Sequence, residues 1–457
     1  MTRFAFVARA SLLLVALPAP VLAGGVRIVE PTGTQNFADI QSAVNAAPDG
    51  AVLLVAGGTY AGFTVFNKSL SILAVGGVTI QGTMTVSSIA SDQTFVAAGL
   101  NVRPPNETAL IALQLEGSTG NVRFQDCTFH AADYANGVLC ESAPARDGVP
   151  GVIVVGCTKV AFTHCTITGG EGEFMDEEAI NCQYHGGGDS GAGLQTNDAA
   201  IVLYDCQVNG ARGGGATTTT GGLGGAGAHL GSTQLFASAC SFRGGNGGFI
   251  SHQNCYGTGG PGVRLAGGST LDEIGSSFQG GFEGCFPPGA FHASIEGGPV
   301  NSIPGPARTA VIGPTVRGDA AQWSVSFQGK ALDRPFLFAS YSPNTQSYLP
   351  FHGAWLTLRA AMLQPQTLPQ ANASGASSAT LPTPDLPAGS LYERRFSQIV
   401  VRGQGQVYLG SGAALFLLDR QSGPDCNGNG TSDFLDVIEG TSPDMNQNLI
   451  PDSCPGG

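Results

Sequence analysis

The C-terminal tail contains the densest group of side chains that could bind a metal ion. Counted from Asp425, oxygen-bearing residues stand at loop positions 1, 3, 5, 9 and 12, and Gly430 stands at position 6, where such a loop must turn sharply. Ca²⁺ prefers about six to eight hard oxygen ligands, and this spacing wraps them round one ion. The sequence therefore predicts a calcium site made by Asp425, Asn427, Asn429, the backbone carbonyl of Thr431, Asp433 and Asp436.

A second copy of this pattern follows in the tail, residues 423–457. Its ligand positions are filled by Asp444, Asn446, Asn448 and Asp452, but Leu449 replaces the glycine and Pro455 stands at position 12. The tandem loops, with Asp rather than Glu at position 12 of the first, resemble dockerin and thrombospondin type 3 calcium loops. A plain Asn/Asp/Gly turn is the alternative. A dockerin that binds a cohesin has longer helices after each loop, so a cohesin-like partner stays open.

A second group of chemically active side chains lies in the middle of the chain. An acidic run extends from Glu171 to Glu178, and arginines begin later glycine-rich segments. The run is open to three interpretations: a solvated loop, a calcium or sugar site, or part of a catalytic site. The candidate ligand-binding residues are Asp176, Glu177, Glu178, Asp189, Arg212, Arg243 and His252.

A repeat between residues 108 and 285 must position these groups. Each unit has an apolar strand, a second strand ending at a marker Cys or Ser, and a third strand leading into Gly-Gly. The markers Cys127, Cys165, Cys206, Cys240 and Ser277 recur after 38, 41, 34 and 37 residues. Such a period indicates a solenoid, and three short strands per unit predict an all-β fold, a right-handed parallel β-helix. Glycine-rich loops should leave one corner of the coil, at 131–150, 170–192, 210–228, 244–261 and 280–290.

One helix precedes the coil and should cover its open end. Asn36 is the expected N-cap, Phe37, Ile40, Ala43, Val44 and Ala47 share a face, and Gly50 ends the segment. With Gly57-Gly-Thr-Tyr60 and residues 68–72, this stretch resembles the N-terminal cap and first rungs of the pectin-lyase-like superfamily. The resemblance implies a coil over residues 24–290. Several β-helix families are enzymes that act on acidic polysaccharides.

The eleven cysteines divide into two groups. Stacked rungs hold equivalent Cα atoms about 4.8 Å apart with parallel side chains, an arrangement unsuited to a disulfide. Cys127, Cys165, Cys206 and Cys240 are therefore expected to be buried thiols, as is Cys157; a metal-binding row is the alternative. The remaining cysteines are disulfide candidates, and six allow 15 connectivities. Pairing between neighbours would join Cys140 to Cys182, Cys255 to Cys285 and Cys426 to Cys454.

After about residue 293 the repeat stops. Alternating apolar segments over 291–422 predict a small antiparallel β-sandwich that covers the C-terminal end of the coil, with a Pro-rich exposed loop at 364–389.

Residues 1–23 have a basic start, an apolar run and a small-residue cleavage site, which predict a signal peptide and a secreted or cell-surface protein. No later segment is apolar enough to span a membrane. A net charge of −13 with few lysines argues against nucleic acid as a partner.

The paired Asp residues of β-helix hydrolases are not evident in the sequence, and no Asn-Thr-Asp motif occurs. Two functions therefore stay open. One is a non-catalytic protein that binds extracellular polysaccharide or a surface partner through its loops, with Ca²⁺ in the tail. The other is a polysaccharide lyase or glycoside hydrolase acting on acidic polysaccharide.

Overall fold

The computed structural model describes residues 25–31, 37–106, 108, 110–134, 138–139, 145–176, 186–216, 220–250, 255–283, 291–348, 352–357, 363, 365–403 and 405–456. The predicted signal peptide, Glu177, Glu178, His252, Cys140, Cys182 and Cys285 lie outside these ranges.

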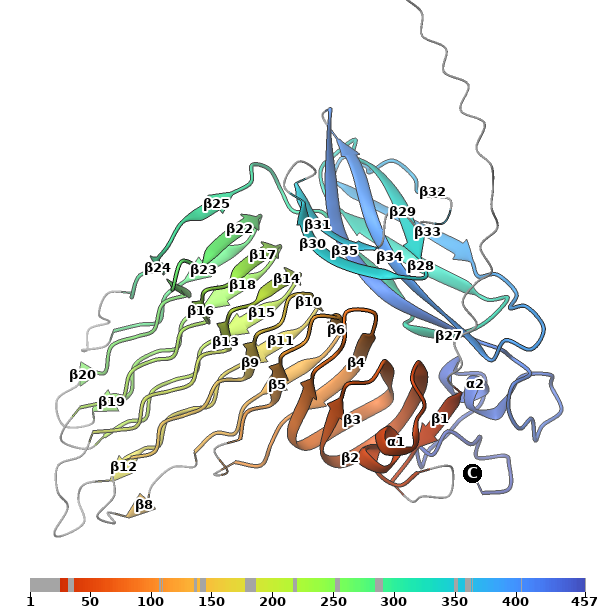
Figure 1. Cartoon of the computed structure of the whole chain (residues 1–457), viewed down its shortest axis with the longest axis horizontal. Coiled ribbons are helices and arrows are strands. Elements are labelled where there is room, and N and C mark those ends of the chain that lie inside the picture. The colour runs from red at the N-terminus through yellow and green to blue at the C-terminus, as the bar shows by residue number, and fades with distance from the viewer. Residues whose placement is uncertain are drawn as a thin grey trace, which may run out of the picture.

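The N-terminal two thirds form a right-handed parallel β-helix, as the repeat predicts (Figure 1). Its repeating rungs have three faces. The first contains β5 (Leu113–Glu116), β9 (Val152–Val155), β13 (Leu194–Asn197), β16 (Ala228–Gly231), β21 (Val263–Ala266) and β24 (Ile295–Gly297). The second contains β6 (Asn121–Gln125), β10 (Val160–Thr163), β14 (Ala200–Tyr204), β17 (Gln234–Ser238), β22 (Thr270–Ile274) and β25 (Val300–Ser302). The third contains β7 (Thr128–His130), β11 (Thr166–Thr168), β15 (Gln207–Asn209), β18 (Ser241–Arg243) and β23 (Ser277–Gln279). Because β24 and β25 pair with β21 and β22, the coil extends beyond residue 290.

The first rungs differ from the prediction of short separate strands. After β1 (Val26–Val29), three long strands bend round the coil: β2 (Ala51–Phe66), β3 (Leu70–Ser87) and β4 (Thr94–Val102). The cap helix α1 spans Ile40–Ala46, and its N-cap is Asp39 rather than Asn36, because the Asp39 carboxylate accepts the Ser42 N–H at 2.7 Å. The predicted buried face of this helix is confirmed at Ile40, Ala43 and Val44.

The interior of the coil is a continuous apolar column with side chains stacked rung upon rung. Phe124 and Phe162 stack with ring centroids 5.0 Å apart. The marker cysteines Cys127, Cys165, Cys206 and Cys240 are buried and unpaired, as is Cys157, which confirms the thiol ladder. Burial raises the pKa of Cys165 and Cys240, so these thiols stay protonated.

The C-terminal residues form two packed sheets that lie along the side of the coil (Figure 1), not over its end as the sequence suggested. One sheet contains β26 (Thr309–Gly313), β28 (Gln322–Gln328) and β33 (Ala376–Pro382). The other contains β27 (Val316–Gly318), β35 (Gln406–Leu418), β34 (Tyr392–Gly403), β29 (Arg334–Ser340) and β32 (Gln366–Thr367). A hairpin of β30 (Pro343–Tyr348) and β31 (Gly353–Thr357) adjoins them. The expected exposed loop at 364–389 is also wrong in part, since β33 pairs with β28 along its whole length.

The second face of the coil is the one that the sandwich covers. Val202, Tyr204 and Phe236 point outward from this face and are buried among sandwich residues. The Tyr204 hydroxyl donates to the carbonyls of Ala354 and Leu409, at 3.1 and 3.0 Å. Strands β6, β10, β14 and β17 are therefore buried on both sides along most of their length, and they are not available to a ligand.

The glycine-rich segments between the third and first faces are a regular bundle rather than irregular loops. In each rung one extended chain leaves the coil and a second returns, and all these chains lie side by side (Figure 1). Their backbone hydrogen bonds repeat every third residue: Gly169 and Gly172 donate to the next outgoing chain, and Gly187 and Ser190 to the next returning chain. Gly191 and Gly188 link the two layers by donating to Gly170 and Glu173. We call these segments the glycine bundle.

Glycine is required here because the chains are too close for a side chain. A period of three matches the extended polyproline II helix, in which two of every three residues face neighbouring chains in such a bundle. A Cβ atom on Gly225 would overlap the carbonyl oxygen of Gly191, and one on Gly248 would overlap that of Gly214. The prediction that these segments leave one corner of the coil is confirmed for the described residues, and there they stack into one wall.

We predict that Gly225→Ala strongly destabilises the protein, because the methyl group collides with backbone that cannot rotate away. Overpacking typically costs about 1–3 kcal/mol, and we expect at least that loss in the free energy of unfolding measured with urea. Gly77→Ala is the matched control, since a Cβ there meets nothing within 4 Å. Equal stability of the two variants would contradict the close packing of the bundle.

A second ladder runs along the corner between the second and third faces. Asp126, His164 and Asp205 have φ of 52°, 53° and 54° and stack in successive rungs. His164 Nδ1 lies 3.3 Å from Asp126 Oδ1, and Nε2 lies 3.6 Å from Asp205 Oδ2. Burial alone would lower the pKa of His164, but the hydrogen bond and charge of Asp126 and the charge of Asp205 outweigh it, so this pKa is raised.

A raised pKa in the folded state means that protonated His164 stabilises the fold. This stabilisation is complete below the unfolded pKa of about 6.5 and is lost as the pH rises through the folded pKa. We therefore predict that His164→Asn, which tolerates the positive φ, costs more stability near pH 5.5 than near pH 8.5. Urea unfolding of both proteins at about these pH values measures the difference. The same loss at both values would rule out a role for the imidazolium.

Candidate functional site

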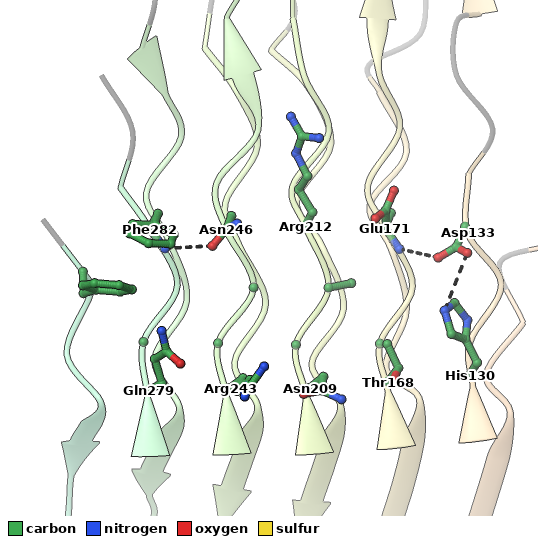
Figure 2. Close-up of a pocket in the computed structure, with 17 residues that line it drawn as sticks. His130, Asp133, Thr168, Glu171, Asn209, Arg212, Arg243, Asn246, Gln279 and Phe282 are labelled. Carbon is green, nitrogen blue, oxygen red and sulfur yellow. Dashed lines mark hydrogen bonds and ion pairs between the residues drawn. The ribbon is translucent and has the colours of Figure 1, made fainter. Parts of the chain in front are cut away.

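The glycine bundle presents an ordered array of side chains on its outgoing layer. Within each outgoing chain the pattern is two small residues followed by a larger one, as in Gly169-Gly-Glu171 and Gly244-Gly-Asn246. Since the small residues face other chains, the larger one faces solvent. Figure 2 shows the two resulting rows. The row next to the coil is His130, Thr168, Asn209, Arg243 and Gln279, and the outer row is Asp133, Glu171, Arg212, Asn246 and Phe282.

These two rows line a shallow groove of about 390 Å³ that crosses successive rungs. Neighbouring rungs are about 4.8 Å apart, so the groove suits a long ligand better than a compact one. Its floor consists of glycine backbone, including Gly210, Gly244 and Gly280. The side chains that line the groove therefore carry amide, guanidinium, carboxylate and imidazole groups, and the surface between them is glycine backbone.

The middle of the groove carries two arginines, and the charge of one of them, Arg212, acts on Glu171. Arg212 and Arg243 come from adjacent rungs, beside Asn209 and Asn246 (Figure 2). Within the described part of the chain, no hydrogen bond or ion pair engages either guanidinium. A guanidinium presents donors in a fixed planar fork that matches a carboxylate or sulfate.

Carboxylates gather at the N-terminal end of the groove. Asp133 Oδ2 lies 3.8 Å from both His130 Nε2 and Arg103 Nη2, and Glu171 stands one rung away. Burial raises the pKa of Glu171, and the charge of Asp133 adds to the effect, although Arg212 and His130 oppose it. Two carboxyl groups from adjacent rungs are thus brought together.

Some of these polar groups also hold the bundle together. Asp133 Oδ1 accepts the backbone N–H of Glu171 at 3.0 Å, and Asn246 Oδ1 accepts that of Phe282 at 2.9 Å. On the returning layer, Asp189 Oδ1 accepts the N–H of Leu223 in the same way. In these three chains, the N–H of the outward residue is satisfied by an Asp or Asn of the previous rung.

The C-terminal end of the groove is aromatic. Phe282 and Phe291 have ring centroids 4.0 Å apart, and they are 40% and 52% exposed. Exposed aromatic pairs of this kind offer an apolar platform for the C–H face of a sugar ring or for another apolar ligand.

The structure divides the residues expected to form one site. Arg212 and Arg243 line the groove together, whereas Asp189 lies in the returning layer, outside its lining. Asp176 belongs to β12 (Met175–Asp176), which pairs with β8 (Val138–Leu139) at the far end of the bundle. The predictions for Glu177, Glu178 and His252 concern residues outside the described part. Glu171, the first residue of the acidic run, does line the groove. The missed groove residues are His130, Asp133, Thr168, Asn209, Asn246, Gln279, Phe282 and Phe291, and the three-residue glycine pattern is the signal that marks most of them.

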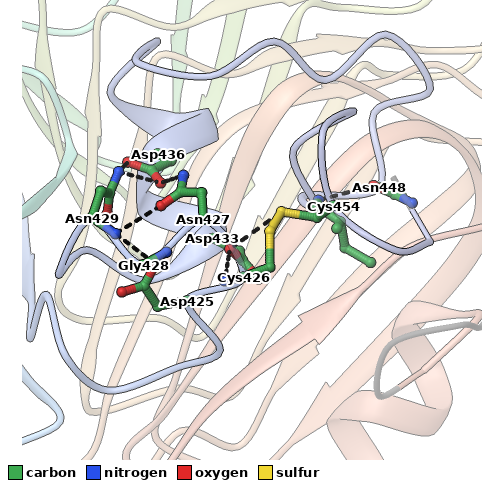
Figure 3. The surroundings of a disulfide bond; sticks show 10 residues. Asp425, Cys426, Asn427, Gly428, Asn429, Asp433, Asp436, Asn448 and Cys454 are labelled. Carbon is green, nitrogen blue, oxygen red and sulfur yellow. Dashed lines mark hydrogen bonds between the residues drawn. A yellow bond between two sulfur atoms is a disulfide. The ribbon is translucent and has the colours of Figure 1, made fainter.

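The first tail loop brings its predicted ligands together except for one (Figure 3). The side-chain amides of Asn427 and Asn429 lie 2.9 Å from the Asp436 carboxylate. The Asp425 carboxylate accepts the N–H groups of Gly428, Asn429 and Gly430. Asp433 instead turns aside to accept the N–H of Cys426. The carbonyl of Thr431 is part of the same loop.

Asp436 is 2% exposed and yet ionised. Burial alone would raise its pKa, but hydrogen bonds from Asn429, Thr441 and Asn427 outweigh burial, and the pKa is lowered. A buried carboxylate surrounded by oxygen-bearing side chains fits a hard cation such as Ca²⁺.

The second tail loop has the same backbone pattern without the final acid. Asp444 accepts the N–H groups of Asn448 and Leu449, Asn446 accepts that of Asn448, and Asp452 accepts that of Met445. The Asn448 amide donates to the carbonyl of Gly456, at 2.7 Å, where the first loop uses Asp436.

The tail is closed by a disulfide, and its helix packs against the rest of the chain. A disulfide joins Cys426 to Cys454, as expected (Figure 3). Helix α2 (Asp433–Ile438) places Phe434 and Leu435 against apolar residues of both the coil and the sandwich. Cys255 belongs to β20 (Cys255–Tyr256), which pairs with β19 (Phe249–Ile250). Its disulfide with Cys285 stays a prediction.

No protein-family profile matches the chain, and no curated protein does. Among solved structures, it is similar to the full-length tailspike protein 2 of Escherichia coli O157:H7 bacteriophage CAB120, at 7% identity and a TM-score of 0.30, with 86% of this chain covered. It is also similar to the enzymatically active domain of bacteriophage CBA120 tailspike protein 4, at 12% identity and a TM-score of 0.13, with 80% covered. The chain spans 64% of each structure.

Proposed function

We propose that this protein is a secreted or cell-surface β-helix that binds an extracellular polysaccharide along the groove of the glycine bundle. The single observation that supports this most is the pair of groove arginines, Arg212 and Arg243, whose guanidinium groups make no hydrogen bond or ion pair within the described residues. They lie in a long groove that ends in the Phe282–Phe291 platform. Polysaccharides are long, polar and faced with C–H groups, which suits this combination. The predicted signal peptide supports the location, and none of the described helices is long and apolar enough to cross a membrane.

Arginines whose guanidinium groups make no hydrogen bond or ion pair within the described residues favour a sugar with a carboxylate or sulfate group over a neutral one. We therefore predict that a panel of neutral, uronic-acid and sulfated polysaccharides gives binding to an anionic member. Arg212→Ala and Arg243→Ala should each weaken that binding about tenfold or more, because a hydrogen bond to a charged group contributes about 1.5–3 kcal/mol. Titration calorimetry measures the affinity.

Arg264→Ala is the matched control, since Arg264 lies on β21 and pairs with Glu296 outside the groove. Thermal unfolding should be nearly unchanged in all three variants, because exposed substitutions cost within about 0.5 kcal/mol. Binding that survives both groove substitutions would place the ligand elsewhere.

A second candidate function, glycoside hydrolysis, is favoured by the carboxylates of Asp133 and Glu171. A raised pKa is what a general acid needs, and a second carboxylate nearby can serve as base or nucleophile. New reducing ends released from the bound polysaccharide would support hydrolysis, and unsaturated ends would support a lyase. Glu171→Gln should then abolish turnover and leave binding intact. Binding without either product supports the non-catalytic function.

For the tail, we propose that the first loop binds Ca²⁺ through Asp425, Asn427, Asn429, Thr431 and Asp436. The second loop is a weaker candidate, because it lacks an acid at its last position. Asp433 could contribute only by turning away from Cys426.

We predict that Ca²⁺ raises the melting temperature and protects the tail from proteolysis, since a ligand that binds only the folded state stabilises it by about 2.7 kcal/mol at 100 times its dissociation constant. Asp425→Ala should abolish the binding heat, whereas Asp92→Ala, in an exposed turn of the coil, should not. Identical melting and proteolysis in calcium and in chelator would disprove the site.

A further inference from the structure

Two arginines are buried where the coil meets the sandwich. Arg123 projects from β6 on the second face of the coil, and Arg394 projects from β34. They are 5% and 7% exposed. Both guanidinium carbons lie over the ring of Phe396, at 4.9 and 5.2 Å from its centroid. Two positive charges therefore share one desolvated interface.

No carboxylate within the described residues pairs with either arginine. Arg123 Nη2 donates to the carbonyls of Asn344 and Leu356, and Arg394 Nη1 donates to Ser71 Oγ. The Nε atoms of Arg123 and Arg394 are buried without an acceptor. Another buried arginine of the sandwich, Arg308, does have a counter-charge, since its Nε lies 2.9 Å from Asp333 Oδ2.

The two charges cannot be removed by deprotonation at neutral pH. Burial, together with the charge of Arg394, lowers the pKa of Arg123 to about 9, and burial lowers that of Arg394 to about 10. Both side chains therefore stay cationic. A buried charge without a counter-charge is strongly destabilising, and a buried polar atom without a partner often marks an ion or water at that place.

A small cavity lies beside Arg123 in this interface. Its volume is about 10 Å³, and Arg123, Gln125 and Thr163 line it together with apolar residues that include Phe124 and Ala414. That volume admits a single small particle and leaves no room for a polyatomic ion. A water molecule could accept a hydrogen bond from Arg123 Nε but would leave the positive charge uncompensated. A monatomic anion would accept the hydrogen bond and also compensate the charge.

We propose that this cavity binds one small inorganic anion of the chloride type, which provides a counter-charge for Arg123, offsets its repulsion with Arg394 outside the cavity lining, and fastens the sandwich to the coil. Sulfate and phosphate are too large for the space. The anion would approach Arg123 Nε, with Gln125 and Thr163 beside it.

Crystals of the native protein grown without halide and then soaked in sodium bromide provide the direct test. The expected result is an anomalous bromide peak within hydrogen-bonding distance of Arg123 Nε. A peak absent from this place, with density for a water molecule only or for no species, would overturn the proposal. Bromide peaks confined to exposed arginines would be adventitious and would count against it as well.

Stability in solution gives a second, independent test. The melting temperature should rise by a few degrees and then saturate as chloride replaces gluconate at constant ionic strength. Arg123→Met should lose this dependence, while Arg264→Met, on the exposed first face, should keep it. Equal melting in chloride and gluconate would contradict the proposal. If Arg123→Met does not fold, the bromide soak of the native protein still decides.

Discussion

The structure depends on one interaction, the backbone hydrogen bond between a rung and its neighbour. Parallel pairing repeats each residue about 4.8 Å further along the coil, so a side chain meets the residue at its own position in the next rung. Cys127 therefore lies near Cys165, Phe124 stacks on Phe162, and His164 lies between Asp126 and Asp205. The glycine bundle continues the same translation outside the coil, with Asp133 and Asn246 each supporting the next chain. Groups that would be scattered in a globular protein become rows.

This constraint also decides which surface can bind a ligand. The interior of the coil is filled, and the sandwich covers the second face through Tyr204 and Phe236. The third face continues directly into the outgoing chains of the bundle, whose outward side chains form two straight rows. Because two of three residues in those chains are committed to packing, the remaining one is the position at which side chains can vary freely. The polar groove is thus a consequence of the bundle's period.

The coil could be predicted because its signal is local and repeated: marker residues at a regular interval, apolar alternation and a helix ahead of the first rung. The position of the sandwich was harder to predict than the coil. Strands of the second face carry apolar residues on both sides, such as Phe162 and Ala161 in β10, and this two-sided pattern is typical of a covered sheet. The groove was predicted only in part. Arg212 and Arg243 stood out by residue type. Asp133 and Asn246 become informative only once the neighbouring glycines are understood to allow close packing of extended chains rather than to form turns.

The two tail loops show how one backbone can serve two purposes. Gly430 in the first loop and Leu449 in the second both have positive φ, of 83° and 62°. For leucine this left-handed conformation costs about 1–2 kcal/mol, and it persists because Leu449 is buried among residues of the coil and sandwich. Gln447, beside it, lies against Gly57, where a Cβ would overlap its side chain. The second loop therefore packs against the coil and sandwich through Leu449, at the position where the first loop has a glycine, and it lacks an acid at its last position. The first loop is exposed over its first half and keeps its acids. Since the Cys426–Cys454 disulfide ties the loops together, an ion bound in the first would restrain the contact that the second makes with the coil.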